Sequence, residues 1–155
     1  MAKKKGLSIA DIYDAESSES TEFRRILHNL GKSTRGGQKQ AVLITSATLS
    51  EGKSLIASFL AMTSAMHRYN KTLLIDFDLR RPTLHKLFDV KRQQGLAEII
   101  LDGLAPRNAV KATSVDKLDI LTAGKFVANP SDLLKSAEVH RITAVSYTHL
   151  RAHET

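Results

Sequence analysis

The 155-residue sequence has no cysteine, few aromatic residues and no long apolar run. Without cysteine it can form neither disulfides nor thiolate metal sites, which fits a reducing, intracellular setting. Aromatic residues make up only 5% of the chain, so no aromatic platform for stacking single-stranded nucleic acid is visible. No apolar run approaches the length of a membrane span, and the N-terminus lacks the apolar core of a signal peptide. The sequence therefore predicts an intracellular protein with no nucleic-acid partner.

Hydrophobic residues make up 42% of the chain and charged residues 25%, which is typical of one soluble globular domain. The formal net charge is +7, with basic clusters at residues 3–5, 32–39 and 80–92. A basic balance can indicate nucleic acid, an anionic membrane face or an acidic partner. We favour a solvated surface together with a phosphate-binding site.

The most informative stretch is AVLITSATLSEGKSLIASFLA, residues 41–61. It predicts a strand over 41–44, a loop of small residues, and then a helix that begins near Lys53 and Ser54. In this arrangement loop amides surround the β- and γ-phosphates of a nucleotide, the lysine neutralises their charge, and the serine hydroxyl reaches Mg²⁺. Ala47 replaces the first glycine of the usual pattern. The predicted nucleotide-binding residues are Thr48, Ser50, Glu51, Gly52, Lys53, Ser54 and Leu55. The alternative is a surface loop with a merely solvated Lys53.

A second strand is predicted over residues 72–78, TLLIDFD, and it ends in two acids. Asp76 and Asp78 are two residues apart and so alternate between the faces of a strand. One of them can point at the phosphate loop, where a carboxylate orders Mg²⁺ or takes a proton from an attacking hydroxyl. Arg80 follows two residues later and is a candidate phosphate ligand. Alternatively, the acids simply cap a turn.

Strands alternating with helices predict an α/β fold with a parallel sheet that has helices on both faces. Residues 1–20 are expected to form a flexible N-terminal arm and residues 31–40 a glycine-rich connector. Further helices are predicted over residues 21–30, 83–88, 95–101 and 133–142, and a third strand over 118–123.

Three segments resemble the bacterial tyrosine kinases of capsule and exopolysaccharide systems, a P-loop family. They are TSATLSEGKS (45–54), LLIDFDLRRP (73–82) and LTAGKFVANPSDLLKS (121–136). The resemblance implies an ATP- and Mg²⁺-dependent kinase domain over residues 21–144. It also implies that Lys53 binds phosphate, that Ser54 and Asp76 hold the metal, and that Asp76 acts as general base with Asp78 assisting.

Glu22, Arg25 and Asn29 match the family's oligomerisation motif, although His28 stands where a second arginine is expected. An ordinary amphipathic helix is the alternative. The runner-up family is the MinD/ParA ATPase switches, whose loop carries a signature lysine where this chain has Thr48. A structural module that does not bind nucleotide remains a third possibility.

Two parts of the family pattern do not appear in the sequence, a D-x-P-P strand and a C-terminal tyrosine cluster. Residues 145–155, VSYTHLRAHET, resemble a translated sequencing adapter, so we expect a C-terminally truncated chain that is poorly active or inactive by itself. The resemblance implies that the parent protein phosphorylates tyrosines on itself or a neighbouring subunit and regulates polysaccharide synthesis. It further implies a homo-oligomer at the cytoplasmic face of the membrane, with a membrane chain-length regulator as activating partner.

Overall fold

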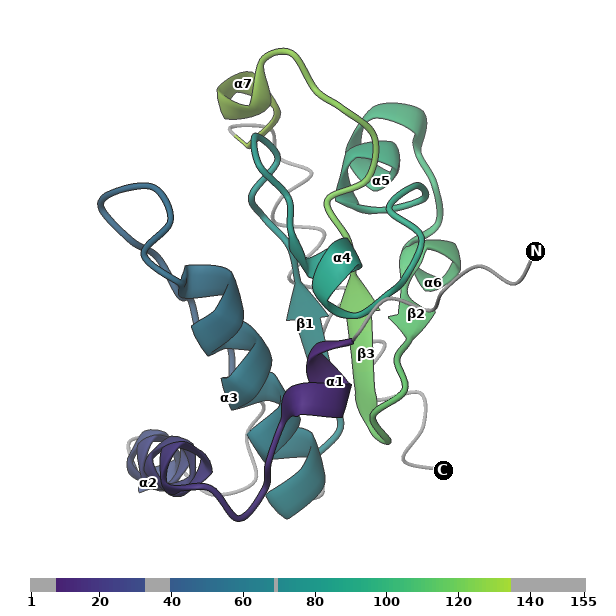
Figure 1. Cartoon of the computed structure of the whole chain (residues 1–155). Coiled ribbons are helices and arrows are strands. Elements are labelled where there is room, and N and C mark those ends of the chain that lie inside the picture. The colour runs from purple at the N-terminus through teal and green to yellow at the C-terminus, as the bar shows by residue number, and fades with distance from the viewer. Residues whose placement is uncertain (1–7, 33–39, 69, 135–155) are drawn as a thin grey trace, which may run out of the picture.

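The computed structural model describes residues 8–32, 40–68 and 70–134, and these residues build a three-stranded sheet between helices (Figure 1). The strands are β1 (Thr72–Ile75), β2 (Lys111–Ala112) and β3 (Leu118–Leu121), in the order β1-β3-β2. β1 and β3 are parallel, with Thr72 opposite Leu118, which confirms the predicted parallel pairing. β2 adds an antiparallel edge that the sequence analysis did not predict, so the sheet is mixed.

Helices cover both faces of the sheet, as predicted. Ile120 on β3 packs in one core cluster with Met62 of α3 and Leu84 of α4, while Leu121 packs in a second cluster with Leu96 of α5. Alternate residues of a strand point to opposite faces, so β3 serves both clusters. The helices are α1 (Ile9–Ile12), α2 (Ser18–Lys32), α3 (Lys53–His67), α4 (Leu84–Leu87), α5 (Leu96–Asp102), α6 (Pro106–Ala109) and α7 (Pro130–Leu134).

Helix ends follow local sequence signals where these are strong. The side chain of Glu98 accepts hydrogen bonds from the backbone N–H groups of Gln94 and Gly95 and so caps the start of α5. Gly103 ends the same helix in the left-handed region, at φ 68°. In the described ranges, no helix combines the length and apolar character needed to cross a bilayer.

The prediction of a flexible arm over residues 1–20 is wrong for residues 8–20. Ile9 of α1 is buried in the core, and the Ser8 hydroxyl donates to the carbonyl of Leu87 at 3.3 Å. Tyr13 also reaches the core, with its hydroxyl 2.8 Å from that of Thr63. The polar residues Ser18, Glu19 and Ser20 form the start of α2, which is therefore longer than the predicted helix over 21–30. Ile9 and Tyr13 therefore hold this N-terminal segment against the core.

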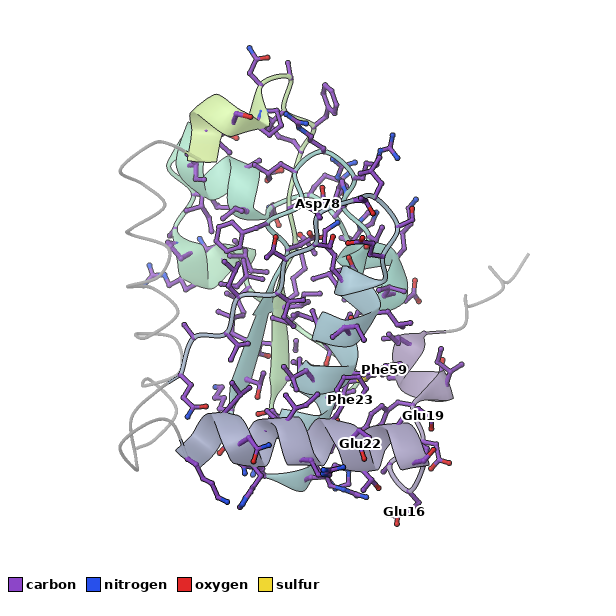
Figure 2. The ribbon with its side chains drawn as sticks, turned by 90° about the vertical axis from the view of Figure 1, so that its left-hand side faces the viewer. Glu16, Glu19, Glu22, Phe23, Phe59 and Asp78 are labelled. Carbon is purple, nitrogen blue, oxygen red and sulfur yellow. The ribbon has the colours of Figure 1, made fainter. Side chains whose placement is uncertain are left out.

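α2 packs across α3 through aromatic contacts. Phe23 of α2 lies beside Phe59 of α3, with ring centroids 5.7 Å apart (Figure 2). Tyr13 contacts the same Phe59 ring from the segment before α2, at 5.8 Å between centroids. This aromatic group joins the N-terminal segment to the helix that follows the phosphate loop.

The predicted strand over residues 41–44 does not form. These residues are not in the sheet, and the side chain of Leu43 is 82% exposed. In the described part of the chain β1 has a hydrogen-bonded neighbour on one side only, which is β3. A strand is stable only when another strand pairs with its backbone groups. Among the described residues the apolar run 41–44 pairs with no strand, not even with the open edge of β1, so its strand-like sequence is not enough.

Candidate functional site

The predicted site residues lie where β1 ends. β1 stops at Ile75, and Asp76, Phe77 and Asp78 continue beyond it without strand structure. Figure 2 shows Asp78 in the loops above the ends of the strands. In open α/β sheets, ligands bind outside the carboxyl ends of the parallel strands. The fold therefore places these acids at the edge where a ligand site is expected.

The phosphate loop leads directly into α3, which begins at Lys53. Gly52 occupies the N-cap position in the left-handed region, at φ 81°, and Ser50 also has a positive φ of 62°. Among the residues that the structure describes, no side chain caps α3, and the first N–H groups of any helix lack partners within it. The start of α3 therefore offers free amides and the positive end of a helix dipole, as anion sites do.

Lys53 and Asp78 meet across these two loops. Lys53 Nζ lies 3.0 Å from Asp78 Oδ2, and the two side chains are 30% and 23% exposed. The other carboxylate oxygen, Oδ1, accepts a hydrogen bond from the backbone N–H of Arg81 at 2.9 Å. Partial burial acts to raise the pKa of Asp78, but Arg81 N–H and the Lys53 ammonium outweigh it and hold the pKa below its usual range. Asp78 is therefore a charged, fixed partner of the lysine.

Asp76 has a different environment, because its side chain is only 4% exposed. One of its carboxylate oxygens accepts the N–H of Asp78 at 3.0 Å, and the other accepts the N–H of Leu84, at the start of α4, at 3.3 Å. Burial raises the pKa of Asp76, although both N–H groups favour the charged form. A carboxylate whose pKa is raised toward neutrality is better suited to accept a proton. Its two backbone bonds also show that Asp76 shapes the loop.

Most of the other predicted nucleotide-binding residues are exposed, while Ser54 is partly buried. Thr48 donates to the carboxylate of Glu51 through its hydroxyl at 2.7 Å and through its backbone N–H at 3.3 Å. These two bonds lower the pKa of Glu51 and close the loop on itself. Leu55 is exposed on the first turn of α3, while the Ser54 carbonyl accepts the hydroxyl of Ser58 within that helix. The loop residues lie together as predicted, and their role in nucleotide binding stays a prediction.

The side chain of Arg80 extends toward α7. It is exposed, and its guanidinium approaches the Ser131 hydroxyl of α7 at 3.5 Å. The two residues belong to the rim of an open hollow of about 370 Å³, which Phe126 also lines. The sequence analysis singled out the segment 121–136, which contains Ser131, but did not place it beside Arg80. Arg80 and Ser131 are 51 positions apart in the sequence, so no local sequence pattern predicts that they lie close together.

The predicted oligomerisation residues lie on α2, separate from the phosphate loop. Glu22 and Arg25 form an exposed ion pair with each other, 2.8 Å between Oε1 and Nη1. Arg25 and Asn29 also line a shallow hollow of about 350 Å³ with His28. This geometry is that of a solvated helix face.

The donor set fits a nucleotide with Mg²⁺. Lys53 and the first amides of α3 suit phosphate oxygens, while Ser54 and the two acids supply the hard oxygen ligands that Mg²⁺ prefers. Among the described residues, no group of three histidine, cysteine or acidic side chains could hold a metal by itself. That is compatible with Mg²⁺, which typically binds through one or two carboxylates together with phosphates and waters.

Known proteins with similar sequences and structures are tyrosine kinases, although no protein-family model matches the chain. CapB of Staphylococcus aureus is 38% identical over 141 residues, which is 89% of this chain and 61% of that protein. Tyrosine-protein kinase YwqD of Bacillus subtilis is 38% identical over 123 residues, covering 79% of this chain and 52% of that protein.

The kinase domain of Escherichia coli tyrosine kinase ETK superposes with a TM-score of 0.84 at 26% identity, covering 96% of this chain and 58% of that one. The chimerical protein CapA2B2 gives a TM-score of 0.81 at 30% identity, covering 91% and 62%. The chain thus spans about half to three fifths of the length of these four proteins. In sequence and in fold, it is a relative of the bacterial tyrosine kinases and shares their P-loop domain.

Proposed function

We propose that the chain is the nucleotide-binding part of a bacterial-type protein-tyrosine kinase that transfers the γ-phosphoryl group of MgATP to tyrosine. The observation that carries this proposal is the meeting of Lys53 and Asp78 at 3.0 Å, at the carboxyl end of β1 and beside the uncapped start of α3. The kinase relatives support ATP as the phosphoryl donor.

In this proposal catalysis consists of positioning and charge neutralisation. Lys53 and the amides at the start of α3 hold the phosphates, and the Ser54 hydroxyl and Asp76 hold Mg²⁺. When bound, the metal neutralises charge on the phosphates. Asp76, whose pKa is raised by burial, accepts the proton of the tyrosine hydroxyl or orients that hydroxyl, with Asp78 assisting. Thr48, Ser50, Glu51, Gly52, Leu55 and Arg80 complete the proposed nucleotide site.

The same proposal includes the partners that the family resemblance implies. They are a second copy of the kinase, contacted through Glu22, Arg25 and Asn29, and a membrane chain-length regulator that activates it at the cytoplasmic face. The exposed position of the Glu22–Arg25 pair on α2 supports a contact there, because neither side chain is taken up by this chain's own core. The regulated process in this proposal is synthesis of an exopolysaccharide or capsule.

The experiment that tests the proposal measures MgATP binding to the 155-residue chain by calorimetry, with Lys53→Ala as the variant. We expect the variant to lose at least tenfold in affinity, since its loop no longer neutralises the phosphates. Lys125→Ala is the matched control, because Lys125 is also paired with an acid, Asp102, but lies on the α5 side of the molecule. Equal affinity of the Lys53→Ala chain would refute the proposed site.

Phosphotyrosine distinguishes the kinase from an ATPase switch, which releases only free phosphate. The assay adds radiolabelled MgATP to the chain together with a tyrosine-containing polymer, and it scores phosphotyrosine and inorganic phosphate separately. Phosphate release without phosphotyrosine, dependent on Lys53, would support the switch.

A further inference from the structure

Asp78 occupies the position of a competitor for the phosphate-binding lysine. Its Oδ2 lies 3.0 Å from Lys53 Nζ, while Oδ1 is held by the N–H of Arg81 at 2.9 Å. The carboxylate is thus fixed to its own loop on one side and to the lysine on the other. Any phosphate that binds Lys53 has to share the ammonium with this carboxylate or displace it.

We propose that Asp78 makes the phosphate loop selective for the magnesium complex of the nucleotide over the metal-free nucleotide. The inference rests on the proposed function, since it assumes that Lys53 binds nucleotide phosphates. It goes beyond that function by naming the residue that decides which form of the nucleotide binds.

The physical reason is like-charge repulsion at close range. Metal-free ATP brings several negative charges to a lysine that already faces a carboxylate at contact distance. Both side chains are partly buried, where charges interact more strongly than in water. Complexation with Mg²⁺ removes two units of negative charge from the nucleotide, so the same carboxylate disfavours the complex far less.

Asp76 cannot have this role in the conformation seen here, although it is the neighbouring acid. Its side chain is 4% exposed, and its two oxygens accept the N–H groups of Asp78 and Leu84. Asp78 is the acid of the two that contacts Lys53. We therefore assign the effect on the binding of metal-free ATP to Asp78 and not to Asp76.

The test is calorimetric titration of ATP into the 155-residue chain, once with excess EDTA and once with Mg²⁺. For Asp78→Asn we expect metal-free ATP to bind at least tenfold more tightly than to the unmodified chain. Asparagine keeps an oxygen that can accept the Arg81 N–H, so the loop should hold its shape. Asp78→Glu keeps the charge, and we expect it to retain most of the preference for the magnesium complex.

Two controls separate a local effect from a change in overall charge or structure. Asp102→Asn, at the end of α5, removes one carboxylate that is also paired with a lysine, Lys125, and should leave metal-free affinity unchanged. Circular dichroism melts show whether each variant is folded. If Asp78→Asn is folded but binds metal-free ATP no more tightly than the unmodified chain, the inference is overturned.

The titrations also separate the inference from the function on which it rests. Lys53→Ala tests the function, because it should weaken MgATP binding whatever Asp78 does. Loss of binding in Lys53→Ala with no gain in Asp78→Asn overturns the inference alone. No ATP binding by the unmodified chain, or unchanged binding in Lys53→Ala, overturns both.

Discussion

Two regions with similar apolar content have opposite structural outcomes. Around β3, Ile120, Leu121 and Leu96 are almost completely buried. Around the phosphate loop, Leu43, Leu49 and Ile56 are exposed, and the predicted strand over 41–44 is absent. β3 has a strand on each side and a helix layer on each face, whereas residues 41–44 have no strand partner among the described residues.

This difference shows that apolar sequence specifies a strand only where partners are present. Burying apolar side chains requires a surface to bury them against, and strand backbone groups require a pairing edge. The β3 region has both within residues 70–134. Residues 41–44 pair with no strand among the described residues, and Leu43 stays exposed.

The largest expected effect comes from truncating one apolar side chain in each region. Ile120→Ala removes most of a fully buried side chain and should lower the free energy of unfolding by about 2–5 kcal/mol. Leu43→Ala changes a side chain that is 82% exposed and should stay within about 0.5 kcal/mol. Urea unfolding followed by circular dichroism measures both. If Leu43→Ala were as costly as Ile120→Ala, the 41–44 run would be packed in solution and the contrast would fail.

Glycine substitutions sharpen the same contrast. A Cβ at Gly95 would collide with the carbonyl oxygen of Thr122 and the backbone N of Gly124. At this point the N–H of Leu96 in α5 donates a 2.8 Å hydrogen bond to the Thr122 carbonyl, just after β3. Gly95→Ala should therefore cost about 1–3 kcal/mol, as overpacking of a core does. Gly52→Ala meets open space and should cost only about 1 kcal/mol, the conformational penalty of its positive φ. The same urea titration compares them, and a smaller loss for Gly95→Ala would contradict the close approach.

Local sequence signals predicted those features whose structure depends on residues close together in the sequence. The bounds of α5, the start of α3 at Lys53 and the acids that follow the apolar residues of β1 lie at or near their predicted positions. The sequence predicted that one of the two acids points at the phosphate loop, and in the structure the acid that contacts Lys53 is Asp78. Docking of Ile9 and the proximity of Arg80 to Ser131 depend on tertiary packing between distant segments, for which the sequence carries no local signal.

The pH dependence of stability compares the two regions through one glutamate in each, Glu98 in α5 and Glu51 in the phosphate loop. Burial acts to raise the pKa of Glu98, but the N–H groups of Gly95, Gln94 and Lys125 outweigh it and hold the pKa below its usual range. A lowered pKa stabilises the fold above the ordinary value of 4.5, and this stabilisation is lost as pH falls through the folded-state pKa. Glu98→Gln should cost about 1–2 kcal/mol at pH 7 and reduce the loss of stability on acidification.

Glu51 is the matched control, because it caps the N–H of Thr48 three residues earlier, as Glu98 caps Gly95. It is fully exposed, so we expect Glu51→Gln to leave the stability profile from pH 7 to pH 3 unchanged within error. The pKa of Asp76 is raised by burial, so Asp76 changes the pH dependence of stability in the opposite direction to Glu98. Both variants retain Asp76, so its effect is the same in each. Identical profiles for Glu98→Gln and Glu51→Gln would show that the two caps do not differ.

The smallest expected effect concerns Thr83, the N-cap residue of α4. Its hydroxyl oxygen is buried and makes no hydrogen bond within the described residues, because Asp76 binds the first N–H of α4 instead. Burying a hydroxyl without a partner is unfavourable, and valine has nearly the same shape without that oxygen. Thr83→Val should therefore leave the free energy of unfolding unchanged or raise it by up to about 1 kcal/mol. In Thr48→Val the lost hydroxyl does have a partner, Glu51, so its stability should stay equal or fall slightly. A clear loss of stability in Thr83→Val would mean that the hydroxyl is bonded in solution, and that the loop beside Asp76 differs from the arrangement described.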